Sequence, residues 1–398
     1  MKNLKIFTNN IEQEAVDQIN KLLDQDAFKD SKVRIMPDVH SGSGCVIGFT
    51  ADLGKKVIPN IVGVDIGCGV RVVKFLDKKE IDLKDLDNFI KNNIPSGFNI
   101  HNPGDEVENC IDLKDLYCYE KLRNKESLPL AIGTLGGGNH FIELDKDDDG
   151  FIYLVVHTGS RNLGCQVAKI YQEIAIKHCF KVDKDSIHNL IQKLKDEGKE
   201  KEIQNELLKL KNSVEQSTFP KELAYLEGKE RDEYLHDMRL CQMFAIINRE
   251  TICNKIVDYL NIKEYESFES VHNYIDDNNM VRKGAICASK NKPVIIPLNM
   301  RDGSIIGIGK GNEDWNFSAP HGAGRLMSRS KARETLKLDD FKKSMDGIYT
   351  STVDETTIDE APMVYKNASE IINLIKDTVE ITNLIKPIYN FKASGKEK

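Results

Sequence analysis

The sequence lacks an apolar run long enough to cross a membrane, and it lacks a hydrophobic leader. No run approaches the roughly 20 apolar residues that a membrane-spanning helix needs. The N-terminal segment reads MKNLKIFTNNIEQEAVDQI and has no apolar core of the kind found in signal peptides. We therefore predict a soluble, cytoplasmic protein that has no membrane partner.

Paired cysteines are also missing. The nine cysteines are odd in number and scattered, and no two of them form a CxxC pair. This pattern argues against both a disulfide framework and a zinc ribbon. Reduced thiols, as in the cytosol, are the simplest interpretation for most of them.

An excess of positive charge is absent as well. The chain has 56 Lys and Arg against 63 Asp and Glu, a formal net charge of −7. A uniformly basic surface that binds nucleic acid without specificity is therefore not expected. A local basic groove remains compatible with these numbers, because net charge does not describe how charge is distributed.

No internal repeat or Pro/Ser-rich linker divides the 398 residues. Glycine-interrupted apolar runs alternate with helical blocks, without the regular βαβ rhythm of a doubly wound sheet. The pattern predicts an α+β fold, with one large mixed-sheet domain over residues 1–392. A charged helical insertion is expected at about residues 181–215, and a disordered tail at residues 393–398.

Individual elements follow from the same patterns. We predict helices over residues 12–23, 328–336 and 368–384, and mostly helical structure over residues 166–251. Apolar and β-branched runs predict buried strands within residues 33–40, 47–54, 55–75, 130–144 and 151–164. Residues 269–325 should be rich in strands and loops, and a last short strand should include IYNFKA.

Histidines concentrate where strands are expected to end. Five of the nine lie beside Gly, Asn or Asp in such positions, which is where scaffolds commonly hold catalytic and ligand side chains. These five are His40, His140, His157, His272 and His321.

Three of these histidines combine with an acid and a thiol into a candidate metal site. Asp65 and Cys68 share a glycine-rich turn in VGVDIGCGV, while His140, His157 and His272 follow or precede apolar runs. Taken singly, each motif is also compatible with a buried cysteine, a turn-capping aspartate or a core histidine. Together they form the set that a two-metal site would use, and a thiolate with imidazoles favours Mn²⁺, Zn²⁺ or Co²⁺ over Mg²⁺ or Ca²⁺.

His321 stands apart as a candidate nucleophile. It lies in the small-residue loop of APHGAGRLMSRSKAR, ahead of a predicted helix rich in Arg and Lys that could neutralise a phosphate. A basic helix with a capping loop that contacts nucleic acid is the alternative. The residues thus indicate a metal-dependent phosphate-transfer enzyme.

Several segments, taken in order, resemble the RtcB family of RNA ligases, which act in tRNA splicing and RNA repair. They are MPDVH with the following SGSG, VGVDIGCGV, LGGGNHFIE, HTGSRNLG, HNY, RKGA, HGAGRLMSRSKA and DEAPMVYKN. The resemblance runs from about residue 34 to residue 392, and it implies an RtcB-like fold.

The resemblance also implies an activity. The family joins an RNA 3′-phosphate or 2′,3′-cyclic phosphate end to a 5′-hydroxyl end, through a guanylyl-histidine and an RNA-3′-pp-G intermediate. It implies GTP and two Mn²⁺ ions per chain, with Zn²⁺ or Co²⁺ as substitutes in vitro. The partners implied are such RNA ends and an activating protein of the archease type.

Roles carry over to matching positions. Cys68 would bridge both metal ions, His140 and His157 would complete one site, and Asp65 and His272 the other. His321 would be guanylylated, and Arg161 and Arg325 would hold the RNA phosphate. The implied contacts to the guanine nucleotide are Asn139, His140, Phe141, Ile142, Glu143, His272, Asn273, Pro297, Leu298, Asn299, Met300, Ser304, His321, Gly322, Ala323, Gly324, Tyr365 and Lys392.

The sequence departs from the family pattern in two places. Its nucleotide loop is PLNMRDGS where members usually have Pro-Gly-Ser-Met-Gly, and Lys392 is followed by Ala393 where many have a terminal Gly. Both departures bear on nucleotide preference more than on metal chemistry.

Other functions remain open. One is a subtype that repairs a particular cleaved RNA, with the same end chemistry. Another is a metal-dependent RNA-end phosphodiesterase or cyclic-phosphate hydrolase without guanylylation. A non-catalytic RNA-binding relative is the third, and the presence of His321 with all five candidate ligands argues against it.

Overall fold

The computed structural model describes residues 3–105, 111–180, 184–215 and 220–393. The strands are β1 (Leu4–Ile6), β2 (Val33–His40), β3 (Ile47–Asp52), β4 (Gly69–Phe75), β5 (Phe141–Lys146), β6 (Ile152–Thr158), β7 (Tyr265–Val271), β8 (Asn273–Ile275), β9 (Met280–Lys283), β10 (Ala285–Cys287), β11 (Pro293–Asn299), β12 (Gly303–Gly309), β13 (Ser318–Pro320), β14 (Tyr349–Thr350) and β15 (Val379–Lys392). The α-helices are α1 (Gln13–Leu23), α2 (Pro59–Val62), α3 (Leu83–Asn93), α4 (Arg161–Cys179), α5 (Lys184–Asp196), α6 (Ile203–Glu215), α7 (Gly228–Tyr259), α8 (Arg329–Thr335), α9 (Leu338–Ser344) and α10 (Ala368–Leu374).

The largest sheet has the strand order β11-β12-β15-β5-β6-β4-β7, with β14 paired alongside β15. Its pairings along this path are antiparallel, so neighbouring strands need no crossover helices. The sheet curls: the Ile295 N–H on β11 donates to Ser270 Oγ on β7, although these strands lie at opposite ends of the path (3.2 Å). The curl gives the sheet an inner and an outer face.

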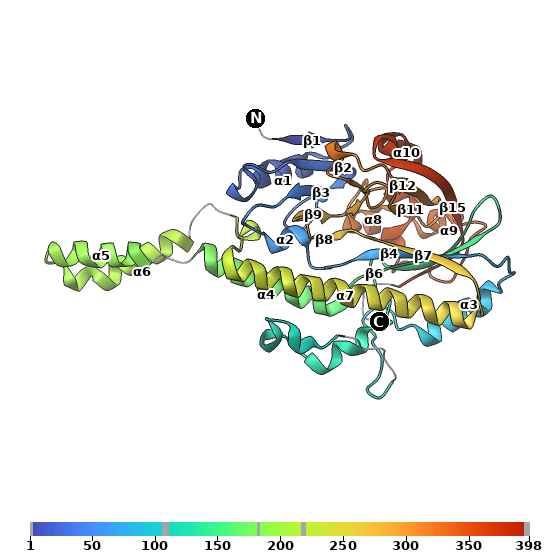
Figure 1. Ribbon diagram of the computed structural model, residues 1–398, viewed down its shortest axis with the longest axis horizontal. Coiled ribbons are helices and arrows are strands. Elements are labelled where there is room, and N and C mark those ends of the chain that lie inside the picture. Colours follow the sequence, from blue (N-terminus) through green and yellow to red (C-terminus); the bar gives the residue numbers. More distant parts are fainter. Residues whose placement is uncertain (1–2, 106–110, 181–183, 216–219, 394–398) are drawn as a thin grey trace.

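Helices cover the outer face. Leu154 and Val156 of β6 pack in one core cluster with Ile252 and Ile256 of α7 and Ile90 of α3. Figure 1 shows α4 and α7 running side by side along the sheet that contains β4, β6 and β7. Successive side chains of a strand point to opposite faces of the sheet. Val155 of β6, which lies between Leu154 and Val156, therefore contributes to a separate cluster on the inner face.

A second, five-stranded sheet has the order β1-β2-β3-β9-β8 and carries α1. Helix α1 buries Ala15, Ile19, Leu22 and Leu23, which recur at helical spacing along one face. The helix predicted over residues 12–23 is therefore confirmed. So are the α+β class and the helix predicted near residues 328–336.

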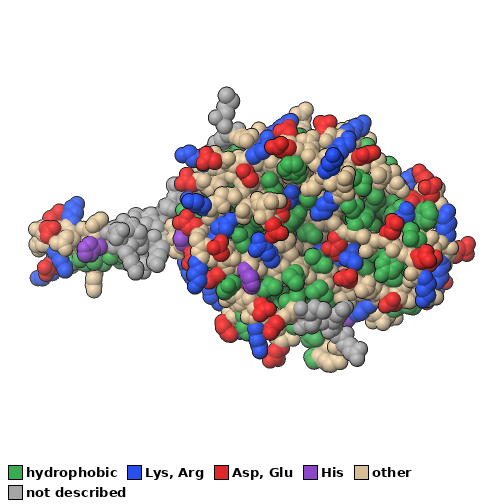
Figure 2. All heavy atoms as spheres, in the orientation of Figure 1, with side chains coloured by type: hydrophobic (Ala, Val, Ile, Leu, Met, Phe, Trp, Pro, Cys, Tyr) green, Lys and Arg blue, Asp and Glu red, His purple; other side chains and the backbone are tan. Residues whose placement is uncertain are grey.

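The charged stretch forms the predicted pair of helices, α5 and α6. In Figure 1 the pair projects from one end of the molecule, away from both sheets. Figure 2 shows Lys, Arg, Asp and Glu side chains interspersed over the visible face of the main body, in keeping with the balanced composition. Among the described residues, none of the helices is both long and apolar enough to cross a membrane.

Three sequence predictions were wrong in their details. Residues 59–62 form a short helix with Pro59 in its first turn, where the missing N–H costs nothing. Residues 130–140 are a turn and loop, because Gly133, Gly136 and Gly138 all adopt positive φ. Helix α10 ends at Leu374, and the chain from Val379 onward is one 14-residue strand rather than helix.

The long strand β15 has a local cause. Its first half is rich in β-branched residues and alternates buried and exposed positions, which suits a strand between two neighbours. It joins β12 to β5 in the large sheet. The tail predicted to be disordered lies outside the described residues apart from Ala393.

Candidate active site

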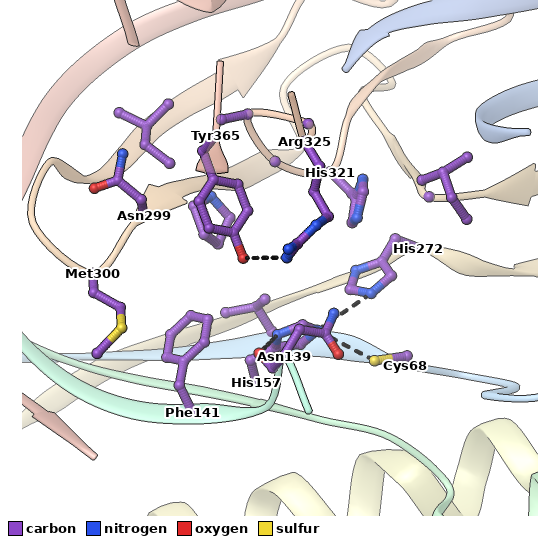
Figure 3. Close-up of a pocket in the computed structure, with 18 of the residues that line it drawn as sticks. Cys68, Asn139, Phe141, His157, His272, Asn299, Met300, His321, Arg325 and Tyr365 are labelled. Atoms are coloured by element: carbon purple, nitrogen blue, oxygen red, sulfur yellow. Dashed lines mark hydrogen bonds between the residues drawn. The ribbon is translucent and has the colours of Figure 1, made fainter. Parts of the chain in front are cut away.

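A cavity of about 310 Å³ opens between the inner face of the large sheet and the loops that follow β7, β11 and β13. Nineteen of the residues predicted from the sequence line it. They are Asp65, Cys68, Asn139, Phe141, Glu143, His157, His272, Asn273, Pro297, Leu298, Asn299, Met300, His321, Arg325, Tyr365 and Lys392, together with the loop residues Gly322, Ala323 and Gly324. Figure 3 shows the side chains from both walls converging on this space.

The Asp65–Cys68 turn is built by glycine. Gly67 has a φ of +73°, and a Cβ at this position would lie 2.8 Å from the Gln242 Cα on α7. Only glycine allows this approach, so the turn is pressed against α7. The Cys68 N–H donates to the Asp65 carbonyl, and the His272 N–H donates to the Cys68 carbonyl (3.2 and 2.9 Å). These two backbone hydrogen bonds fix the positions of Asp65, Cys68 and His272 relative to one another.

Two histidine rings are oriented by carbonyl groups. His140 Nδ1 lies 3.0 Å from the Leu135 carbonyl oxygen, and His157 Nδ1 lies 3.1 Å from the Asn139 carbonyl oxygen. A carbonyl only accepts, so each Nδ1 carries the hydrogen and each Nε2 presents a lone pair. Those Nε2 atoms lie 3.6 and 3.2 Å from Cys68 Sγ. Carbonyl-oriented imidazoles of this kind are typical of metal ligands.

The donor atoms fall into two groups that share Cys68. One contains Cys68, His157 and His272, and the other contains Asp65, Cys68 and His140, each with its donor atoms within 4.8 Å of one another. Within these groups the His157 and His272 Nε2 atoms are 3.4 Å apart, and His140 Nε2 is 3.0 Å from Asp65 Oδ2. The shared thiolate agrees with the expected bridge.

The resemblance implies that His140 and His157 serve one ion, and Asp65 and His272 the other. In the structure His140 Nε2 lies beside Asp65 and His157 Nε2 lies beside His272, and Cys68 belongs to both groups. The assignment of each donor to an ion stays a prediction.

Burial favours the protonation states that metal binding needs. It lowers the pKa of His157 and His272 well below the ordinary value, and neighbouring histidines lower both further. Burial also raises the pKa of Asp65, but the hydrogen bond and charge of His140 outweigh it and the pKa falls to about 2. Burial and the adjacent Asp65 raise the pKa of the Cys68 thiol, so metal binding would have to displace its proton.

His321 follows β13 and is fixed by a buried acid that sequence reasoning did not single out. Asp38 Oδ2 accepts from the His321 backbone N–H at 3.1 Å and lies 2.6 Å from His321 Nδ1. Asp38 is fully buried on β2. A carboxylate at Nδ1 leaves Nε2 as the nitrogen available in the cavity. The His321 and His272 ring centroids are 4.7 Å apart, so this ring borders the metal-ligand groups (Figure 3).

A second acid overlooked in the sequence organises the opposite wall. Glu360 is buried and contacts Lys392 (2.9 Å), Arg329 (2.8 Å), Arg325 (3.2 Å) and the Tyr365 hydroxyl (2.6 Å). Burial would raise its pKa, but the three cations outweigh burial and lower the pKa to about 2. Lys392 and Tyr365 therefore reach the cavity as members of one ionic network.

The two arginines expected to hold RNA phosphate are placed differently. Arg161 donates to Thr134 Oγ1 and to the Gly97 carbonyl, and its charge acts on Asp65, so it lies beside the Asp65 group without lining the cavity. Arg325 lines the cavity but is engaged by Glu360 and by the Asp359 carbonyl. Among the described residues no carboxylate forms an ion pair with Arg161, so its charge is available to an incoming group.

Three predicted nucleotide contacts do not line the cavity. Ile142 points to the outer face and packs in the helix-covered core, because neighbours on a strand face opposite sides. Ser304 is buried within the sheet, and His140 lies behind the lining as a metal-ligand candidate. Conversely, His40 and Arg329 line the cavity without having been assigned a role there. Asp38 and His40 lie in the segment MPDVH. The sequence signal that could have identified them is a pair of polar residues at the end of an apolar run.

The altered nucleotide loop is compact. Asn299 Nδ2 donates to Asp302 Oδ2 (2.8 Å), and the Asn299 side-chain oxygen accepts from the backbone N–H groups of Arg301 and Asp302. These bonds hold a tight turn between β11 and β12. Leu298 lines the cavity and also packs in a core cluster, which explains how the loop accommodates it in place of glycine.

Comparison with known proteins agrees with these features. The chain matches the model of the family described as "tRNA-splicing ligase RtcB" over residues 25–127 and 106–393. It is 28% identical to the "RNA-splicing ligase RtcB" of Escherichia coli K12, covering 89% of this chain and 88% of that protein. It is 26% identical to the "tRNA-splicing ligase RtcB" of Aeropyrum pernix, over 85% of this chain and 82% of that protein, and 26% identical to the "RNA-splicing ligase RtcB homolog 2" of Entamoeba dispar, over 90% and 78%. The chain belongs to the RtcB family of RNA ligases.

Proposed function

We propose that this chain joins an RNA 3′-phosphate or 2′,3′-cyclic phosphate end to a 5′-hydroxyl end, using GTP and a guanylylated His321. The observation that carries the proposal is the position of His321. Its Nδ1 is bound to the buried Asp38, and its ring borders a cluster of metal-ligand candidates inside one cavity.

The donor set fits a pair of transition-metal ions, which we propose to be Mn²⁺. His140 and His157 would serve one ion, Asp65 and His272 the other, and Cys68 would serve both; the donor atoms lie in two groups that share Cys68. Thiolate and imidazole donors favour Mn²⁺, Zn²⁺ or Co²⁺ over Mg²⁺. When bound, such ions would supply the positive charge that a transferring phosphoryl group needs.

His321 Nε2 would attack the α-phosphorus of GTP. The new N–P bond forms as the bond to the pyrophosphate oxygen breaks, so GMP is left on His321 and pyrophosphate departs. Asp38 keeps the hydrogen on Nδ1 and stabilises the positive charge that the imidazole gains during the attack. Asp38 would thus act on His321 as carboxylates act that orient a catalytic histidine.

Two further displacements would complete the reaction. An oxygen of the RNA 3′-phosphate attacks the guanylate phosphorus, releases His321 and yields an RNA-3′-pp-G end. The 5′-hydroxyl of the second RNA then attacks the RNA 3′-phosphorus, forms the phosphodiester and releases GMP. We expect Arg161, which lies near Asp65 and contacts Thr134 and the Gly97 carbonyl, to hold the RNA phosphate.

The guanine nucleotide would occupy the wall formed by Glu143, Asn299, Tyr365 and Lys392. Glu143 and Lys392 lie on adjacent strands, Lys392 and Tyr365 both contact Glu360, and all four side chains line the cavity (Figure 3 labels Asn299 and Tyr365). Phe141 adds an aromatic surface beside Lys392 Nζ, which lies 5.5 Å from the ring centroid. This combination of polar groups and one flat apolar side chain suits a base.

Three broader expectations accompany the proposal. The catalytic domain would extend over residues 1–392, with the α5–α6 pair as an insertion that contributes nothing to the cavity. An activating protein of the archease type would assist turnover. The chain would act in the cytoplasm, where its cysteines stay reduced; the eight described cysteines are all free.

The test begins with GTP radiolabelled at the α-phosphate. We expect the purified protein with MnCl₂ to acquire an acid-labile, alkali-stable label, and the His321→Ala variant to acquire none while keeping its metal. His178→Ala is the matched control, since His178 lies on α4 outside the cavity. Normal labelling of His321→Ala would refute the nucleophile assignment.

Ligation is then measured with RNA ends of defined chemistry. We expect 3′-phosphate and 5′-hydroxyl ends to be joined, with the 2′,3′-cyclic phosphate joined after its hydrolysis. Hydrolysis of the cyclic phosphate without any labelling of the protein would instead support a metal-dependent hydrolase.

A further inference from the structure

The floor of the cavity contains a buried amide beside the acid expected to contact the base. Asn390 on β15 lies directly opposite Glu143 on β5 in the sheet register. Asn390 Nδ2 donates to Glu143 Oε1 at 2.5 Å, and both side chains are buried. Within the described part of the chain, Asn390 is the only hydrogen-bond partner of the Glu143 carboxylate.

Glu143 needs such a partner if it is to keep one orientation. Rotation about the terminal bond of a glutamate side chain is broad, so a carboxylate without a partner samples many planes. The neighbours of Glu143 cannot fix it. Lys392 Nζ is bound to Glu360, and Asp145, two residues along the same face of β5, is a buried acid without a hydrogen-bond partner among the described residues.

Orientation matters because of what the carboxylate would bind. The Watson–Crick edge of guanine presents two kinds of donor, the N1–H and the exocyclic amino group, whereas adenine presents an acceptor at N1. A carboxylate accepts at both oxygens, so it matches guanine and repels the adenine N1. With Oε1 already accepting from Asn390, the remaining lone pairs face the cavity in a fixed plane.

We propose that Asn390 is a positioning residue for base selection, holding the Glu143 carboxylate so that it accepts from guanine and disfavours adenine. This inference rests on the proposed function, because it requires that a nucleotide binds in this cavity. Asn390 does not contact the reacting atoms, and it acts only through Glu143.

Two further observations agree. Burial outweighs Lys392 and the Asn390 hydrogen bond, so the pKa of Glu143 rises to about 7, but both of these contacts lower it and so favour the charged, accepting form. The Asn390 Oδ1 atom is buried without a partner. An unsatisfied amide oxygen destabilises a fold, so an apolar side chain would serve stability better at this position. What asparagine adds to the site is the Nδ2 group, which donates to Glu143.

The test compares nucleotide selection in Asn390→Leu, which has a similar volume but no donor, with that in Asn390→Ala. Label transfer from GTP and from ATP is measured over a range of concentrations, with thermal unfolding recorded for each protein. Asn383→Leu is the matched control: it lies on the same strand, and its amide contacts Asp147 and Tyr153 instead of Glu143.

We expect KM for GTP to rise about tenfold in both Asn390 variants, and the preference for GTP over ATP to fall by about tenfold or more, as a lost base contact should cause. The rate at saturating GTP should change less than about threefold, since His321 and the metal ligands are untouched. Asn383→Leu should keep the wild-type preference.

Unchanged selectivity in folded Asn390 variants would overturn the inference, and so would an equal loss of labelling with both nucleotides. Loss of cooperative unfolding in both variants would also overturn it, because Asn390 would then be a structural residue. Failure of the proposed function is distinguishable from these results, because the wild-type protein itself would then take no label from any nucleotide.

Discussion

At the scale of single residues, the site depends on groups that fix other groups. His321 is held by Asp38, Glu143 by Asn390, and two of the three metal-ligand histidines by backbone carbonyls. These supporting contacts set tautomers and orientations, so their loss should affect the chemistry without removing any reacting atom.

Asp38→Asn provides one such test. The amide is close in shape, but it removes the negative charge that would stabilise the His321 ring during attack on GTP. We expect guanylylation in a single turnover to slow about 100-fold or more, with metal content unchanged. Asp149→Asn, in an exposed turn, is the control. A rate within about twofold of wild type would contradict the role given to Asp38.

The metal ligands allow a sharper test, because the two groups share one thiolate. Cys68→Ala should lower the occupancy of both ions, because Cys68 belongs to both donor groups, whereas Asp65→Ala should lower the occupancy of one ion only. Metal content is measured by mass spectrometry after gel filtration, with Cys118→Ala as a buried-cysteine control. Two ions per chain in Cys68→Ala would refute the bridge.

Much of this site could be predicted from residue types alone. Asp65, Cys68, His140, His157 and His272 stand out because carboxylate, thiol and imidazole groups recur in glycine-rich turns at strand ends. Which donor atoms come closest to one another could not be predicted, since it depends on which strands become neighbours. Asp38 and Glu360 were overlooked because an isolated acid gives no sign in the sequence that its partners lie about 283 and 32 residues away.

At the scale of secondary structure, strand β15 joins the two parts of the large sheet. Its first six residues were expected to belong to a helix, because an apolar run of isoleucine and leucine also fits a helical pattern when the neighbouring strands are unknown. The β-branched residues of this part and its position between β12 and β5 decide in favour of a strand. Asn390 lies in the part that was expected to be a strand, but its alignment with Glu143 depends on which strand becomes the neighbour of β15, and the sequence does not reveal that.

The ionic network between β15 and Glu360 should contribute to stability in a pH-dependent way. Because its cationic neighbours lower the pKa of Glu360 from 4.5 to about 2, this contribution is fully present above about pH 4.5 and is lost as the pH falls toward 2. We expect Glu360→Gln to reduce the free energy of unfolding by about 3 kcal/mol at pH 7.

Urea denaturation at a series of pH values tests this expectation. The difference between wild type and Glu360→Gln should shrink between about pH 4.5 and pH 2. Glu313→Gln, an exposed acid, should show no such difference. A difference that stays constant down to pH 2 would show that the substitution acts through packing instead of charge.

The helical pair offers a test of domain organisation. The side chain of Cys179, at the end of α4, lies 3.3 Å from the backbone nitrogen of Tyr225 ahead of α7, so the chain leaves and returns at nearly one point. Replacing residues 181–219 by a short Gly/Ser linker should therefore leave guanylylation within about twofold of wild type. Loss of folding in this deletion would show that the pair is an integral part of the domain.

At the scale of the whole molecule, the sheet, its helices and the cavity should respond together to metal. An ion that binds only the folded chain stabilises it by about 2.7 kcal/mol at a concentration 100 times its Kd. We expect MnCl₂ to raise the thermal midpoint of the wild-type protein, and EDTA to lower it. Cys68→Ala should not respond to MnCl₂, and an equal response in that variant would place the stabilising ion elsewhere.

The position of β15 also has a consequence for how the protein is made. This strand lies in the middle of the large sheet, yet it is translated after all of that sheet's other strands. On the ribosome, β11–β12 and β5–β6–β4–β7 would exist as two separate pieces with unpaired edges, and Lys392 would still be missing from the nucleotide wall. Such edges are prone to mispairing until the last strand inserts. Closure of the large sheet, and with it completion of the proposed nucleotide wall, would therefore depend on the last strand of that sheet to be made.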